Sequence, residues 1–102
     1  MQVIVLATVR DFLDSLDPHL RPAAYNLIDL LEEYGRSLTM PVAKPIGGGL
    51  WELRLNARPA IRILYGFCAD TAVLVLAVKK QRPAFLSREI EIARRRLRAY
   101  CS

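Results

Sequence analysis

Two short segments of alternating apolar and polar residues, separated by a turn sequence, predict a β-hairpin in the second half of the chain. The first segment covers residues 50–56 and the second covers residues 60–67, with Ala57-Arg58-Pro59 between them. Antiparallel pairing centred near Arg58 places Arg54 opposite Arg62, and facing like charges on one sheet face are destabilising. A hairpin that keeps both guanidinium groups is suited to hold an anion.

A second interpretation of the same two arginines needs no ligand. Both side chains can lie on a solvated sheet face, with Glu52 placed diagonally to form an ion pair with one of them. The other face of the hairpin is expected to be core, because its residues are apolar: Trp51, Leu53, Leu55, Ile61, Ile63, Tyr65 and Phe67. Tyr65 is therefore expected to be a core residue rather than a catalyst.

The charge is divided unevenly along the chain. Residues 1–43 hold three basic and six acidic residues, a net charge of −3, and residues 44–102 hold twelve basic and four acidic residues, a net charge of +8. A basic surface of this size attracts nucleic acid through its phosphates, in a salt-dependent way. The second half is therefore the candidate polyanion-binding half.

The order of predicted elements indicates one α+β domain over residues 1–102. A strand is expected at residues 3–9, helices at 10–16 and 18–35, a loop at 41–49, strands at 50–56, 60–67 and 72–78, and a last helix from Ser87. The order β-α-α-β-β-β-α gives a small, mostly antiparallel sheet packed against a helical hairpin and a C-terminal helix.

Particular residues mark where these helices begin and end. Asp17 is expected to cap the second helix with Pro18 at its first position, and Gly35 is expected to end it. Ser87 is the expected cap of the last helix. That helix is expected to bury one stripe and to expose its arginines; the stripe is Ile90, Ala93, Leu97 and Tyr100.

Composition argues against several classes of protein. No apolar run approaches the roughly 18 residues of a membrane span, and the first residues do not resemble a signal peptide, so a cytoplasmic location is expected. Cys68 and Cys101 are far apart in sequence and have no histidine nearby, so we expect two structural thiols, no metal site and no cofactor.

Four segments, Gly49–Arg54, Ile61–Tyr65, Val78–Lys80 and Glu89–Ala93, together resemble the phage-derived HigB-like branch of the RelE superfamily, the toxins of bacterial type II toxin–antitoxin pairs. The similarity covers nearly the whole chain. It implies a RelE-like fold and a ribosome-dependent, metal-independent endoribonuclease that cleaves mRNA and inhibits translation. It also implies a cognate antitoxin, a helix-turn-helix protein from an adjacent gene.

The chain departs from the family pattern at two places. Residues 75–78 are apolar where many relatives carry a histidine, and Phe85 falls where some relatives place a functional tyrosine. The only histidine, His19, precedes an acidic helix and is not expected to act as a catalyst. A second function therefore stays open: a non-enzymatic basic binding module, either a degenerate toxin or a ParE-like inhibitor of a host factor such as gyrase. A basic subunit that docks an acidic partner is a third.

Without a suitable histidine, RNA cleavage would depend on cations. Guanidinium pairs bind phosphate and stabilise developing negative charge, and an amine crowded by other cations loses its proton more readily. We expect Arg54 and Arg62 to hold the scissile phosphate, with Lys79 or Lys80 assisting proton transfer. Three further cations are expected to line the approach of the RNA: Lys44, Arg58 and Arg82.

Overall fold

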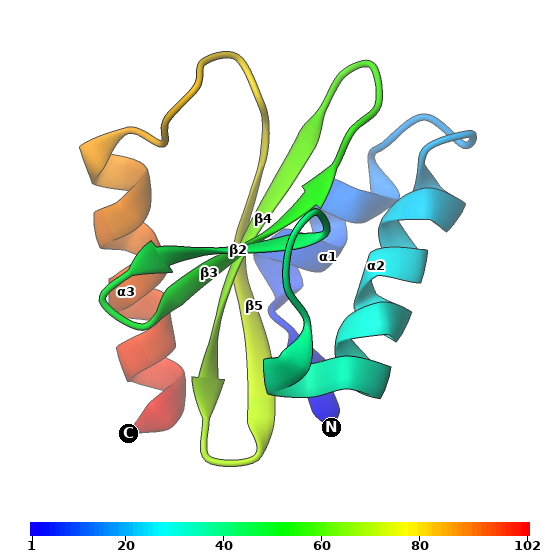
Figure 1. The fold of residues 1–102 in the computed structure, drawn as a ribbon. Helices are drawn as coiled ribbons and strands as arrows, with labels where there is room; N and C mark the ends of the chain where they lie inside the picture. The colour runs from blue at the N-terminus through cyan, green and yellow to red at the C-terminus, as the bar shows by residue number, and fades with distance from the viewer.

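The computed structural model describes residues 1–102 as one five-stranded sheet with helices on both faces (Figure 1). The elements are β1 (Gln2–Val5), α1 (Ala7–Asp14), α2 (Arg21–Tyr34), the 3-10 helix η1 (Gly35–Ser37), β2 (Ala43–Gly47), β3 (Leu50–Leu55), β4 (Ile61–Cys68), β5 (Thr71–Lys79) and α3 (Ser87–Cys101). The sheet order is β1-β5-β4-β3-β2, and only the β1–β5 pair is parallel. The predicted α+β class with a mostly antiparallel sheet is confirmed.

The two faces of the sheet carry separate apolar clusters. The larger cluster joins α1 and α2 to the odd-numbered hairpin residues, among them Leu53, Ile63 and Tyr65, as the alternation of the sequence predicts. The smaller cluster lies under α3 and contains Leu50, Leu64, Val73, Val75 and Ala93. The hairpin therefore separates two cores, with its even-numbered residues on the α3 face.

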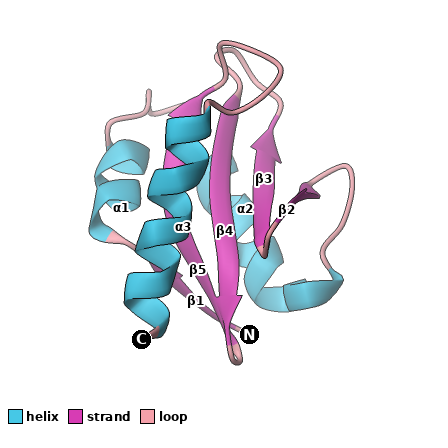
Figure 2. Ribbon diagram, turned by 90° about the vertical axis from the view of Figure 1, so that its left-hand side faces the viewer, coloured by secondary structure: helices cyan, strands magenta, loops and turns pink.

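Helix α3 covers only part of its sheet face (Figure 2). Ala93 is fully buried, and Leu97 lies so close to Gly66 that a Cβ at this glycine would collide with it. Tyr100 is exposed, so its predicted burial is wrong. At the N-terminal end of α3 the sheet surface around Glu52 and Arg62 faces the connection formed by residues 80–86. This uncovered area includes the charged residues of the hairpin.

The predicted loop at 41–49 contains a strand, β2, which pairs with β3 and places Lys44 opposite Glu52. Pro45 is tolerated because β2 is at the edge of the sheet. The three glycines that follow all have positive φ, and Gly48 is close to the Arg94 guanidinium, which donates a hydrogen bond to the carbonyl of Gly47 at 3.3 Å. A side chain at Gly48 would displace that group, and the φ of 61° is one that L side chains rarely adopt, so the turn into β3 favours glycine there.

Helix boundaries differ from expectation in the first half and at α3. β1 ends at Val5, and Val9 belongs to α1, where it is buried. α2 begins at Arg21 rather than at Pro18, because residues 18–20 form a turn that precedes the helix.

The ends of α2 and α3 show how each helix is terminated. Gly35 ends α2 with φ of 54°, as predicted. Ser87 is the first residue of α3, not its cap, and the Glu89 carboxylate accepts a hydrogen bond from the backbone N–H of Leu86 at 2.7 Å. The start of α3 is therefore fixed by Glu89.

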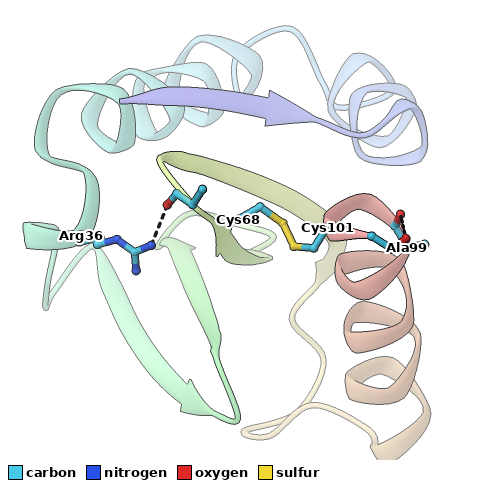
Figure 3. The surroundings of a disulfide bond; sticks show 6 residues. Arg36, Cys68, Ala99 and Cys101 are labelled. Carbon is cyan, nitrogen blue, oxygen red and sulfur yellow. Dashed lines mark hydrogen bonds between the residues drawn. A yellow bond between two sulfur atoms is a disulfide. The ribbon is translucent and has the colours of Figure 1, made fainter.

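The two cysteines form a disulfide, so the prediction of two thiols is wrong. Cys68 ends β4 and Cys101 ends α3, and the bond ties the end of that helix to the sheet (Figure 3). Their Cα atoms are 5.6 Å apart, within the range that a disulfide spans. Beside it, Arg36 donates a hydrogen bond to the carbonyl of Ala69 at 2.9 Å. No helix is long and apolar enough to cross a bilayer.

We expect Cys101→Ser to lower the free energy of unfolding by about 3–4 kcal/mol, because the bond closes a loop with a sequence separation of 33 residues. Urea unfolding of the oxidised protein measures the difference. A reducing agent should lower the stability of the wild type to that of the variant and leave the variant unchanged. Equal stability of the oxidised wild type and the variant would show that the disulfide does not contribute.

Candidate nucleic-acid interface

Glu52 lies between the two arginines of the hairpin. β3 and β4 pair Arg54 with Arg62, as the sequence predicts, and the Glu52 carboxylate lies 3.7 Å from Arg54 Nε and 3.6 Å from Arg62 Nε. The predicted pairing of the two arginines is confirmed. The predicted solvated face is wrong, because Arg62 and Glu52 are buried, and Glu52 forms ion pairs with both arginines rather than with one. One carboxylate opposes two guanidinium groups, so the cluster keeps an excess positive charge.

Arg62 is a buried cation, only 5% exposed. Its Nη1 donates hydrogen bonds to the carbonyls of Ile61 at 3.1 Å and Leu55 at 3.5 Å. Burial lowers the pKa of Arg62, the charge of Arg54 lowers it further, and Glu52 opposes the change. Because a guanidinium does not lose its proton in a protein, this side chain is a fixed positive charge.

The Arg54 side chain is more exposed than that of Arg62 and makes fewer hydrogen bonds. Its Nη1 contacts the Met40 sulfur at 3.6 Å, while its Nε is buried and makes no hydrogen bond. The Nε lies against the Glu52 carboxylate at 3.7 Å, where an anion from solvent cannot reach it. The Nη2 of Arg54 makes no hydrogen bond within the chain, and this outer nitrogen keeps donor capacity for an anion.

A hollow of about 290 Å³ opens beside this cluster, between β4 and the connection to α3. It is lined by four cations, Arg62, Lys79, Lys80 and Arg82. Two carboxylates, those of Glu52 and Glu89, also line it, so positive charge dominates. We call this space the basic hollow. Its volume includes open solvent, so the hollow is shallow, and its positive charge suits a phosphate group that approaches from solvent.

A second, wider hollow of about 540 Å³ adjoins the first and is open to solvent. Its apolar walls include Ile46 of β2 and Ile90 of α3, and Lys44 also lines it. Four residues line both hollows: Glu52, Pro83, Ala84 and Phe85. We call the second space the apolar hollow. The connection at 83–85 thus separates a cationic space from a mainly apolar one.

The structure brings together four of the seven predicted site residues in the basic hollow: Arg62, Lys79, Lys80 and Arg82. Arg54 lies beside it, Lys44 lines the apolar hollow, and Arg58 is exposed in the hairpin turn, away from both hollows. Tyr65 is fully buried, as expected for a core residue, and burial raises its pKa to about 12. His19 lines neither hollow.

Sequence reasoning missed the parts of the site that come from distant segments. Glu89 stabilises the N-terminus of α3 and also lines the basic hollow. Ile46 was expected in a loop, and Ile90 in the buried stripe of a helix. No signal in the sequence indicates that these two residues line one space with Phe85.

The amino-acid sequence matches a known protein family. The family described as phage derived protein Gp49-like matches residues 11–98. The chain belongs to this Gp49-like family. Among curated proteins, none matches it. The solved structure of the isolated RelE toxin of E. coli is similar to this Gp49-like chain, with a TM-score of 0.63, 13% sequence identity, and coverage of 92% of this chain and 96% of RelE. The predicted resemblance to RelE is confirmed at the level of the fold, which is RelE-like in this Gp49-like chain.

We expect the two arginines of this Gp49-like chain to differ in their effect on stability. Arg62→Ala removes the more buried partner of Glu52 and should lower the free energy of unfolding by about 2–3 kcal/mol. Arg54→Ala relieves the repulsion between the two guanidinium groups and leaves the Glu52–Arg62 pair, so stability should change by less than about 0.5 kcal/mol. Thermal and urea unfolding measure both values. Equal losses in the two variants would contradict the central role of the Glu52–Arg62 pair.

Proposed function

We propose that this chain is the toxin of a type II toxin–antitoxin system, of the HigB-like branch, and acts in the cytoplasm as a single domain. The observation that carries the proposal is the basic hollow, in which a buried Arg62 and the exposed Lys79, Lys80 and Arg82 line one solvent-open space. The Gp49-like family and the RelE-like fold support it.

The activity we propose is ribosome-dependent endoribonucleolytic cleavage of mRNA. In such a reaction the 2′-oxygen attacks the adjacent phosphorus, the 5′-oxygen leaves, and one proton passes from the first oxygen to the second. Arg54 and Arg62 would hold the phosphate and stabilise the charge that develops on it. Lys79 or Lys80 would assist the proton transfer, and Lys44, Arg58 and Arg82 would guide the RNA.

The ribosome would supply what the hollow lacks. Its titratable groups are two lysines and the two carboxylates of Glu52 and Glu89, and no imidazole lines it. Orienting the reactive atoms of a bound substrate removes a large part of the barrier to a reaction. We infer that the ribosome fixes the mRNA in a reactive geometry while the cations of the chain bind the scissile phosphate.

The same observation favours a second candidate. A hollow with many cations and no imidazole suits binding without cleavage, as in a degenerate toxin or a ParE-like inhibitor of a host factor. The two candidates differ in one measurable product, because only the nuclease leaves new RNA ends.

We expect production of the chain alone to arrest bacterial growth and the product of an adjacent gene to relieve the arrest. The antitoxin should place acidic side chains over Arg54, Arg62 and Lys79, because covering these cations without counter-charges is costly. Growth curves with and without the neighbouring gene test this. Normal growth with abundant soluble protein would argue against a toxin.

We expect Arg54→Ala and Lys80→Ala to reduce cleavage of ribosome-bound mRNA about a hundredfold, as loss of one positioned charge does in other enzymes. Primer extension measures the cleavage. Arg95→Ala is the matched control, because it removes one exposed positive charge from α3 outside both hollows and should cleave like the wild type. Full cleavage by all three variants would exclude these two cations from the reaction.

We also expect the affinity of the isolated protein for RNA to fall steeply as salt rises, because the contacts are mainly to phosphates. Fluorescence anisotropy with a labelled RNA oligonucleotide at a series of salt concentrations measures the slope. Lys80→Ala should make the slope shallower by about one charge. An affinity that is flat from low to moderate salt would contradict the phosphate-binding role.

A further inference from the structure

The apolar hollow has features that phosphate binding does not explain. Phosphate binding uses the cations of the neighbouring basic hollow, whereas the apolar hollow is walled by Ile46, Phe85 and Ile90. Its volume of about 540 Å³ includes open solvent, and the part that small molecules can occupy is about 250 Å³, close to the lower end of the roughly 300–1,000 Å³ typical of small-ligand sites. Apolar walls with a few polar groups, here Lys44 and Glu52, are the usual composition of such sites, in which the polar groups decide orientation and specificity.

Glu52 is the one side-chain hydrogen-bond acceptor that lines the apolar hollow. Neither of its oxygens accepts a hydrogen bond within the chain, and each lies 3.6–3.7 Å from a single arginine nitrogen. A carboxylate offers about four acceptor positions. Acceptor capacity therefore remains on a side chain that is only 7% exposed.

We propose that the apolar hollow binds a nucleobase with an amino group at position 4 of a pyrimidine or position 6 of a purine, that is, cytosine or adenine. The amine donates to Glu52, the ring packs against Phe85 with Ile46 and Ile90 beside it, and the attached phosphate lies in the basic hollow. This inference rests on the proposed function, because it assumes that RNA occupies the basic hollow.

The chemistry of Glu52 sets the base preference. Glu52 would face the base edge that carries position 4 of a pyrimidine or position 6 of a purine. On this edge cytosine and adenine present amine donors, whereas uracil and guanine present carbonyl acceptors. An acceptor placed against a carboxylate makes no hydrogen bond and is repelled. A well-formed base contact of this kind discriminates by about ten- to hundredfold. Cytosine and adenine should therefore be accepted and uracil disfavoured.

A protein partner with a lysine side chain is the competing occupant, since an ammonium group would also suit Glu52. The cations around the hollow argue against it. Lys44 lines the same space, and Arg62, Lys79 and Lys80 line the adjoining one, so an incoming ammonium is repelled where a nucleotide phosphate is attracted. The charge distribution favours the nucleotide.

The test uses oligonucleotides that cannot be cleaved. Pentamers of 2′-O-methyl uridine, with the central base kept as uracil or changed to cytosine, adenine or hypoxanthine, are titrated against the full chain by fluorescence anisotropy. Hypoxanthine differs from adenine in carrying a carbonyl in place of the 6-amino group. We expect cytosine and adenine to bind about ten- to hundredfold more tightly than uracil and hypoxanthine.

Two variants locate the preference in the hollow. Glu52→Gln can donate as well as accept, so it should reduce the preference for amino-bearing bases to less than about threefold. Ile90→Trp keeps Glu52 but fills the hollow, and it should abolish the preference even if Glu52→Gln does not fold. Glu91→Gln, on the exposed face of α3 outside both hollows, is the matched control and should retain the full preference.

The outcomes separate this inference from the proposed function. Tight, salt-dependent binding with equal affinity for the four pentamers would overturn the base site and leave the toxin proposal standing. A preference that survives both Glu52→Gln and Ile90→Trp would also overturn it. Binding of a short lysine peptide, with no binding of any pentamer, would overturn both and indicate a protein partner.

Discussion

The charged hairpin depends on one carboxylate that two arginines share. Arg54 and Arg62 face each other on neighbouring strands, and Arg62 is buried, so the pair would be strongly unfavourable without Glu52. Because Glu52 neutralises only one positive charge, the cluster is held together and still attracts anions. The same three side chains thus serve the stability of the sheet and its electrostatic field.

Helix α3 completes this arrangement by covering only one part of the sheet. Two of its arginines are directed inward to backbone carbonyls, Arg94 to Gly47 and Arg96 to Val75. These bonds and the small residue Ala93 hold the helix close to the sheet, while its first turn stands beside the uncovered hairpin cluster. The hollows exist because the connection from β5 bridges this uncovered area instead of filling it.

The sequence allowed the hairpin, its two faces and the pairing of Arg54 with Arg62 to be predicted, because alternation and turn residues are local signals. The fold class followed from the order of the elements. β2 was missed because Pro45 and three glycines are typical of loops, whereas its pairing with β3 is a tertiary contact. The apolar hollow, assembled from β2, the 83–85 connection and α3, and the cysteine pair depend on contacts between distant segments. Periodicity along the chain carries no information about either.

The disulfide also has a topological consequence. β5, the 80–86 connection and all of α3 lie within the covalent ring that Cys68 and Cys101 close. The connection is the most exposed stretch of this ring, as residues 80–84 are all solvent-accessible, and exposed loops are where proteases cut. A single cut there would open the ring without dividing the molecule. The walls of both hollows would then stay on one covalent framework, although the backbone that bridges them was broken.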